Sequence, residues 1–124
     1  MESFKQVTTT NEFIDGKMKM FNVGGQEILL VRIDGKYYAT ENRCPHMGGN
    51  LSQGSLQGTV VTCPRHHSQF DLADGHVVRW TDWNGIKLSM AKLLRAPRPL
   101  KTYEIKIEGD KILISAAKGT AGVS

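Results

Sequence analysis

The chain has 124 residues, of which 40% are hydrophobic and 23% charged, so we expect one globular domain over residues 1–124 rather than a disordered chain. Lys and Arg number 16 against 12 Asp and Glu, and this net charge of +4 is not gathered into a basic block, which argues against nucleic-acid binding. No apolar run approaches the roughly 20 residues of a membrane span, and the first residues lack the pattern of a signal peptide.

Strand patterns dominate the chain, and turn residues separate them. In chain order, the sequence predicts strands at 17–23, 26–33, 36–40, 59–62, 68–72, 76–78, 102–107 and 111–114. Asp34 and Gly35, between the second and third of these, are a strong hairpin signal, because a type I′ turn needs positive φ at both central residues. Further hairpins are predicted around 73–75 and 108–110.

Helical spacing predicts one short amphipathic helix at about 85–95, from the apolar residues Ile86, Met90, Leu93 and Leu94. Pro97 lies just beyond its end. The small-residue tail, about 117–124, is expected to fray. Many short strands with turn residues and a single helix predict an all-β fold, an antiparallel sandwich or small barrel.

Two short loops carry the residues with chemistry. The first contains Cys44 and His46 as C-x-H, and the second contains Cys63 and His66 as C-x-x-H, with sixteen residues between the two motifs. A proline follows each cysteine and stiffens the turn. Two such loops can face each other and enclose a metal centre. Two cysteines are also too few for a disulfide scaffold, so the expected compartment is the cytoplasm.

Two metal centres fit these four residues. A Cys₂His₂ set can hold a structural Zn²⁺ in tetrahedral geometry. It can also hold a Rieske [2Fe–2S] cluster, in which two thiolates bind one iron and two imidazoles bind the other. The paired spacing favours the cluster, because each loop then gives one ligand to each iron. His67 is an alternative imidazole within reach, and the spacing from Cys63 favours His66.

On these motifs the sequence resembles the small Rieske-type ferredoxins of bacterial ring-hydroxylating oxygenase systems and, less closely, the small subunit of assimilatory nitrite reductase. The likeness covers nearly the whole chain. It implies an antiparallel β-sandwich with a cluster-binding subdomain at one tip, formed by loops at about 43–50 and 62–70. It also implies one [2Fe–2S] cluster per chain, with the ligands Cys44, His46, Cys63 and His66 and with both imidazoles on the outer iron.

The resemblance implies an electron carrier rather than an enzyme, shuttling single electrons between a reductase and a terminal oxygenase or a similar acceptor. Two alternatives stay open: a small Rieske subunit of a larger, nitrite-reductase-like complex, and a zinc-stabilised binding module. Arg43 and Arg65 lie beside the ligand cysteines, so we expect redox partners with an acidic docking surface. Pro97 and Pro99 bracket a candidate loop that would cover the cluster from the side.

The chain departs from the family pattern in the same two loops. Gly49 and Arg65 stand where high-potential relatives have two disulfide-bonded cysteines, and His67 stands where the family usually has glycine. Those relatives also have a Ser and a Tyr that donate to cluster sulfurs. Here Ser68 could donate to a bridging sulfide, whereas Phe70 has no hydroxyl. Rieske potentials span about −150 to +300 mV, and we therefore predict a reduction potential in the lower half of this range.

Overall fold

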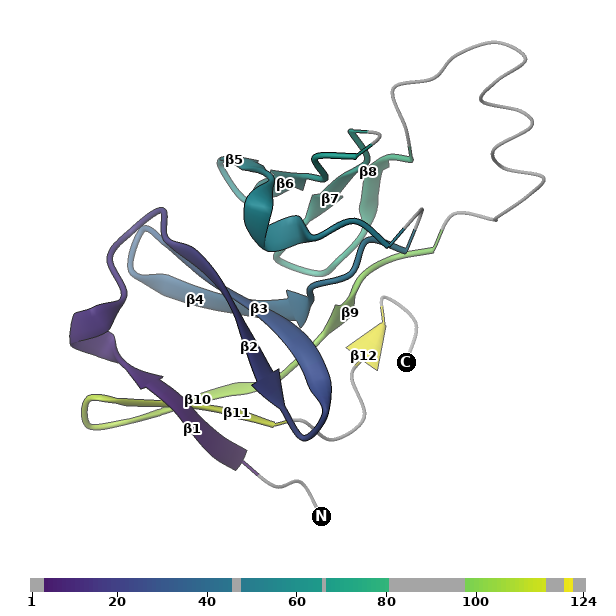
Figure 1. Cartoon of the computed structure of the whole chain (residues 1–124). Coiled ribbons are helices and arrows are strands. Elements are labelled where there is room, and N and C mark those ends of the chain that lie inside the picture. The colour runs from purple at the N-terminus through teal and green to yellow at the C-terminus, as the bar shows by residue number, and fades with distance from the viewer. Residues whose placement is uncertain (1–3, 46–47, 66, 81–97, 116–119, 122–124) are drawn as a thin grey trace, which may run out of the picture.

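The computed structural model describes residues 4–45, 48–65, 67–80, 98–115 and 120–121 (Figure 1). All strand pairs in this part are antiparallel, which confirms the predicted fold class. The predicted helix at 85–95 lies outside the described residues. Within those residues the helical elements are two single 3₁₀ turns, η1 (Thr10–Glu12) and η2 (Leu51–Gln53), and none is long and apolar enough to cross a membrane.

The strands form three sheets. A three-stranded sheet contains β1 (Phe4–Thr9), β11 (Lys111–Ser115) and β10 (Ile105–Glu108) in this order. The middle sheet has the order β12 (Thr120–Ala121), β9 (Lys101–Thr102), β4 (Lys36–Glu41), β3 (Gln26–Ile33) and β2 (Met18–Val23). A four-stranded sheet contains β5 (Ser55–Gln57), β6 (Val60–Thr62), β7 (Gln69–Asp71) and β8 (Val77–Arg79).

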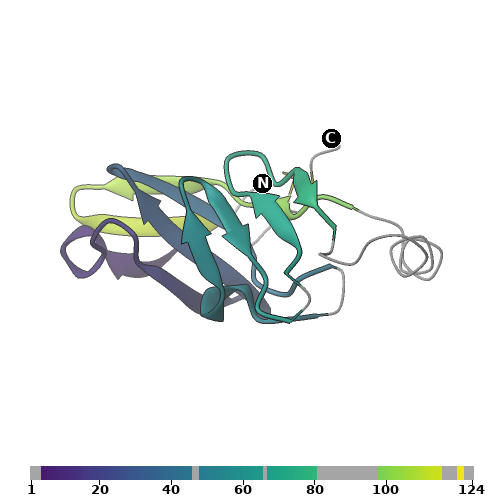
Figure 2. The same cartoon turned by 90° about the horizontal axis from the view of Figure 1, so that it is seen from above.

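In Figure 1 the middle sheet lies between the other two sheets, and in Figure 2, seen from above, the four-stranded sheet overlies it. The middle sheet separates two apolar cores. Toward the three-stranded sheet, the core comprises Phe13, Val23, Ile28, Leu30, Ala39, Ile112 and Ile114. Toward the four-stranded sheet, it comprises Leu29, Val31, Cys44, Leu51, Val61, Cys63, Phe70, Leu72, Trp80 and Leu100. Both cysteines therefore belong to the second core.

Strand β3 is buried on both faces. Side chains alternate along a strand, so Ile28 and Leu30 point into one core, and Leu29 and Val31 point into the other. All four are fully buried. This explains why the sequence shows an unbroken apolar run here rather than an alternating one.

The turn chemistry follows the sequence closely. Asp34 has φ 51° and Gly35 has φ 78°, as the predicted type I′ turn between β3 and β4 requires. Gly24 and Gly25 have φ 60° and 82° between β2 and β3, which makes a second tight hairpin. The hairpins predicted around 73–75 and 108–110 join β7 to β8 and β10 to β11.

Three short elements were not predicted. Strand β1 pairs with β11, and β5 pairs with β6, although neither has a marked alternating pattern. Strand β12 pairs with β9, with Thr120 opposite Thr102 and Ala121 opposite Lys101. The expectation that the whole tail is frayed is therefore wrong at these two residues, because the edge of the middle sheet supplies them with a partner strand.

Candidate metal centre

The first loop runs from Cys44 to Gly49 and is closed by its own backbone. The Cys44 amide donates to the Gly49 carbonyl at 2.8 Å, and the Gly48 amide donates to the Cys44 carbonyl at 2.7 Å. Gly48 has φ 72°, a left-handed conformation that glycine adopts without strain. Below the loop, Arg43 and Asn50 form an isolated β-bridge.

The second loop, Cys63 to Ser68, repeats this hydrogen-bond pattern at equivalent positions. The Cys63 amide donates to the Ser68 carbonyl at 2.8 Å, and the His67 amide donates to the Cys63 carbonyl at 3.1 Å. His67 has φ 60°, so it occupies the left-handed position that Gly48 occupies in the first loop. His67, at the position where the resemblance predicts glycine, therefore adopts a left-handed backbone like that of Gly48.

The two loops face each other across the cysteines. Cys44 and Cys63 are 2% and 1% exposed, and both thiols are free of disulfides. A Cβ added to Gly49 would lie 2.5 Å from Sγ of Cys63 and 3.1 Å from Cγ of Arg65, so the first loop touches the second at this glycine. This close approach brings the two cysteine-bearing loops together.

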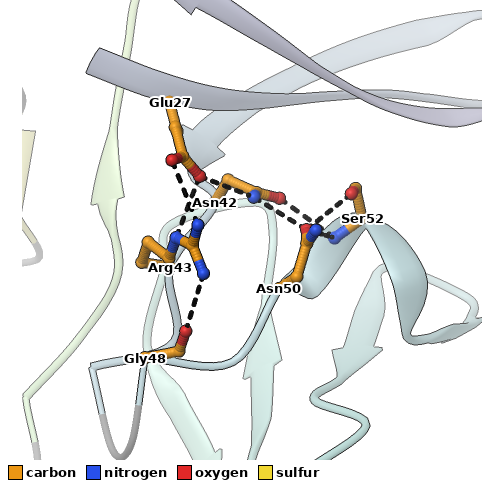
Figure 3. Close-up of polar contacts among 6 residues, drawn as sticks. All are labelled: Glu27, Asn42, Arg43, Gly48, Asn50 and Ser52. Carbon is orange, nitrogen blue, oxygen red and sulfur yellow. Dashed lines mark hydrogen bonds and ion pairs between the residues drawn. The ribbon is translucent and has the colours of Figure 1, made fainter. Parts of the chain in front are cut away.

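Arg43 anchors the first loop to the start of β3 (Figure 3). Its Nε and Nη2 donate to the two carboxylate oxygens of Glu27 at 2.9 and 3.2 Å, and its Nη1 donates to the Gly48 carbonyl at 3.2 Å. The hydrogen bond from Arg43, with a smaller one from Asn42, lowers the pKa of Glu27. The charge of Arg43 is thus matched by a carboxylate, which sequence reasoning did not foresee.

Asn42 is the buried centre of the same network (Figure 3). Its Nδ2 donates to Oδ1 of Asn50 at 2.8 Å, and its Oδ1 accepts from the Ser52 amide at 3.0 Å. Its backbone amide donates to the Glu27 carbonyl, and its carbonyl accepts from the Leu51 amide. These bonds satisfy the polar groups of a fully buried side chain and join the start of the first loop to η2 just after it.

The second loop is held from β8. Arg79 donates from Nε and Nη2 to the His67 carbonyl, at 3.2 and 2.9 Å. The Ser68 hydroxyl is fully buried and donates to the Trp80 carbonyl. Trp80 in turn packs edge-on against Phe70, with ring centroids 6.4 Å apart.

A third segment, residues 98–101, closes the side of the site. Glu41, at the end of β4, accepts from Arg98 at 2.6 and 3.1 Å and from the Lys101 amide at 2.9 Å. The hydrogen bonds to Glu41 raise the pKa of Arg98, and the charge of Cys44 adds a smaller contribution of the same sign. The Leu100 amide donates to the Gly75 carbonyl, which ties this segment to the four-stranded sheet. Pro99 belongs to this segment, whereas Pro97 lies outside the described residues, so the loop expected to cover the cluster stays a prediction.

Of the four expected ligands, the structure describes the two cysteines; His46 and His66 lie outside the described residues. Two buried, facing thiols on equivalent loops suit a centre that takes one thiolate from each loop. Sequence reasoning missed the residues that hold the loops, which are Glu27, Glu41, Asn42 and Arg79. Only Asn50 had a local signal, since Asn followed two residues later by Ser is typical of a turn or cap.

Residues 3–104 match the family described as the Rieske [2Fe–2S] domain. The chain belongs to this family. It is 32% identical over 105 residues to the ferredoxin component of the naphthalene 1,2-dioxygenase system of Pseudomonas aeruginosa, covering 83% of this chain and 86% of the relative.

The fold is similar to those of solved proteins. The ferredoxin of carbazole 1,9a-dioxygenase from Nocardioides aromaticivorans IC177 superposes with a TM-score of 0.74 at 24% identity, covering 90% of this chain and 96% of that one. A chain from the complex of reduced oxygenase and oxidised ferredoxin in carbazole 1,9a-dioxygenase has the same TM-score at 23% identity, covering 93% of this chain and 94% of that one. As a member of this family the chain holds one [2Fe–2S] cluster, and the relative that it matches is named as the ferredoxin component of a dioxygenase system.

Proposed function

We propose that this chain, acting as a single Rieske domain over residues 1–124, takes one electron at a time from a reductase and delivers it to a terminal oxygenase in the cytoplasm. The observation that carries the proposal is the pair of buried cysteines on two facing loops with the same backbone hydrogen bonds. The named relative is the ferredoxin component of a dioxygenase system, and a carbazole dioxygenase ferredoxin was solved with its oxygenase.

The ligand assignment is part of this proposal. Cys44 and Cys63 would bind the inner iron as thiolates, which requires both thiols to lose their protons on metal binding. His46 and His66 would bind the outer iron through neutral imidazole nitrogens. When bound, the cluster supplies a one-electron couple. The protein supplies the buried, hydrogen-bonded loops that hold the four ligands.

The docking surface is proposed to surround the second loop. Pro64, Arg65 and His67 are exposed there, and an open depression of about 350 Å³ lies beside Cys63 and is lined in part by Pro64 and His67. Arg65 and Arg79 place positive charge on this side of the molecule. An acidic patch on the partner would therefore complement this surface.

The ligand assignment is tested by metal content and spectra. We expect about two iron atoms and two acid-labile sulfides per chain and a red-brown colour. His46→Ala and His66→Ala should each abolish the native absorption and EPR spectra, whereas the matched control His67→Ala should retain them. A colourless protein with one zinc ion, or loss of the spectra in His67→Ala but not in His66→Ala, would refute the assignment.

The carrier role is tested by single-turnover kinetics. Protein reduced stoichiometrically under anaerobic conditions should reoxidise rapidly when it is mixed with the oxidised terminal oxygenase of its own system. The same protein should form no product from an aromatic substrate in the absence of that oxygenase. Reoxidation no faster than with an unrelated oxygenase would contradict the role.

A further inference from the structure

In each loop an arginine side chain donates to the backbone carbonyl at the equivalent position. In the first loop the carbonyl of the left-handed residue Gly48 accepts from Arg43, and in the second loop that of His67 accepts from Arg79. The two arginines come from different places, one directly before its loop and the other from β8, a strand that follows its loop. This repeated contact is not a consequence of chain connectivity.

The second loop has the greater need of such a contact. Gly48 adopts positive φ freely, whereas a residue with a Cβ is strained in this conformation. His67 must nevertheless hold it, since its amide closes the loop on the Cys63 carbonyl. Arg79 fixes the orientation of the peptide group after His67 through two hydrogen bonds to the His67 carbonyl. A backbone that relaxed from positive φ would turn this carbonyl away from Arg79.

The two arginines also differ in charge environment. Arg43 is paired with Glu27, so its own charge is matched by a carboxylate. Arg79 forms no ion pair within the described residues, and its guanidinium contacts the loop that carries His66. A positive charge close to a redox centre stabilises the reduced form, which is one charge more negative.

We propose that Arg79 is a positioning residue with two separable effects: it holds the second loop in the left-handed form that His67 resists, and its charge, which has no ion-pair partner among the described residues, raises the reduction potential. The proposal rests on the function proposed above. Its first effect concerns the retention of any metal in this loop, and its second concerns a redox couple, so the two are measured independently.

The test uses the metal-loaded full chain and the variants Arg79→Gln, Arg79→Lys, His67→Gly and the double variant His67→Gly/Arg79→Gln. Arg79→Gln should speed metal release to an excess of chelator by three- to tenfold. In the His67→Gly background, where the loop no longer resists its shape, the same change should speed release by less than twofold. Equal effects in the two backgrounds would overturn the positioning role.

Measuring the reduction potential distinguishes the charge effect of Arg79 from its positioning effect. At low ionic strength, Arg79→Gln should lower the equilibrium constant for reduction two- to fivefold, equivalent to about 20–40 mV for a one-electron couple. Arg79→Lys should keep the wild-type potential but release metal faster, because an ammonium cannot reproduce the two-pronged contact. The difference between Arg79→Gln and wild type should shrink at high salt.

Lys111→Gln is the charge control, since it removes a cation at the start of β11, whose sheet lies across the middle sheet from the loops. It should leave the potential and metal release unchanged. A potential that is the same in Arg79→Gln and wild type, or a shift equally large in Lys111→Gln, would overturn the charge effect. A protein that holds zinc would instead refute the proposed function, while the chelator experiment would still decide the positioning role.

Discussion

Phe70 shows how one side chain can set the chemistry of the site. It is fully buried in the second core and packs against Trp80 next to the second loop. High-potential Rieske proteins resemble this chain in the loop but carry a tyrosine at this position. A phenyl ring fills the same space without a donor for sulfur. The neighbouring Ser68 hydroxyl donates to the Trp80 carbonyl.

We expect Phe70→Tyr to raise the midpoint potential by tens of millivolts, because a new hydroxyl donor to a thiolate sulfur stabilises the reduced, more negative cluster. Spectroelectrochemical titration of the two proteins measures this shift. Phe70→Leu is the control for altered packing and should leave the potential within a few millivolts of wild type while lowering stability. A wild-type midpoint above about +150 mV would contradict the low-potential assignment from the outset.

The sequence locates the two cysteine loops by their local spacing, and the structure brings them together, but the sequence does not reveal the residues that hold them. The Arg79 contact to His67 and the Glu27 contact to Arg43 join residues 12 and 16 positions apart. Such contacts depend on how strands and loops are brought together, which no local pattern encodes.

At the scale of secondary-structure elements, the link from β3 to the first loop is electrostatic. Its contribution to protein stability therefore depends on pH in the acid range. Because Arg43 and Asn42 lower the pKa of Glu27, the unfolded chain binds this proton more tightly than the folded protein. The stabilising effect of the Glu27 carboxylate is fully present above its ordinary pKa of 4.5 and is lost as the pH falls through the lowered folded value.

Stability should therefore fall more steeply in wild type than in Glu27→Gln as the pH is lowered from about 6 to about 3. Urea unfolding at several pH values measures the two slopes. Glu108→Gln is a suitable control, because its carboxylate belongs to an ion pair with Lys106 in the β10–β11 hairpin, away from the loops. Parallel curves for wild type and Glu27→Gln would show that this contact has no role in acid stability.

The turn between β7 and β8 is the second contact between elements that can be tested. Gly75 has φ 83°, and a Cβ there would lie 2.3 Å from the Leu100 carbonyl oxygen, so the turn abuts the 98–101 segment. Gly109, in the β10–β11 turn, has φ 62° but open space around it. The two glycines therefore share the backbone requirement and differ in the steric one.

Gly109→Ala should lower the free energy of unfolding by about 1 kcal/mol, the cost of a left-handed alanine. Gly75→Ala should cost clearly more, roughly 2–4 kcal/mol, because it also forces apart two backbone segments. Chemical denaturation of both variants compares these losses. Equal losses of unfolding free energy in the two variants would mean that the 98–101 segment moves aside at no cost in free energy.

Elements with strong patterns were predicted well, and those with weak patterns were not. The Asp34-Gly35 hairpin and the runs of β3 and β11 follow directly from turn chemistry and alternation. Strands β1 and β5 were missed because their residues are mostly polar or exposed and are strands only by virtue of their partners. Tertiary pairing, rather than propensity, determines such strands.

For the molecule as a whole, the charges around the second loop predict how it meets its partner. We expect the rate of electron transfer to the true acceptor to fall as ionic strength rises, because screening weakens attraction to an acidic surface. Stopped-flow reoxidation over a salt series measures the slope. Arg65→Gln should flatten it, whereas Lys111→Gln should not. A rate that stays flat or rises with salt would contradict an acidic docking surface.

The double burial of β3 has a consequence for how the chain finds its fold. A slip of one residue in the pairing of β3 would turn Ile28 and Leu30 toward the loops and Leu29 and Val31 away from them. Every side chain would still be buried, so hydrophobicity alone does not forbid this misfold. What forbids it is the shape of both cores together with the tight Asp34-Gly35 and Gly24-Gly25 turns, which fix the strand from both ends. A correctly aligned β3 is thus a precondition for Glu27, at its start, to meet Arg43 at the first loop.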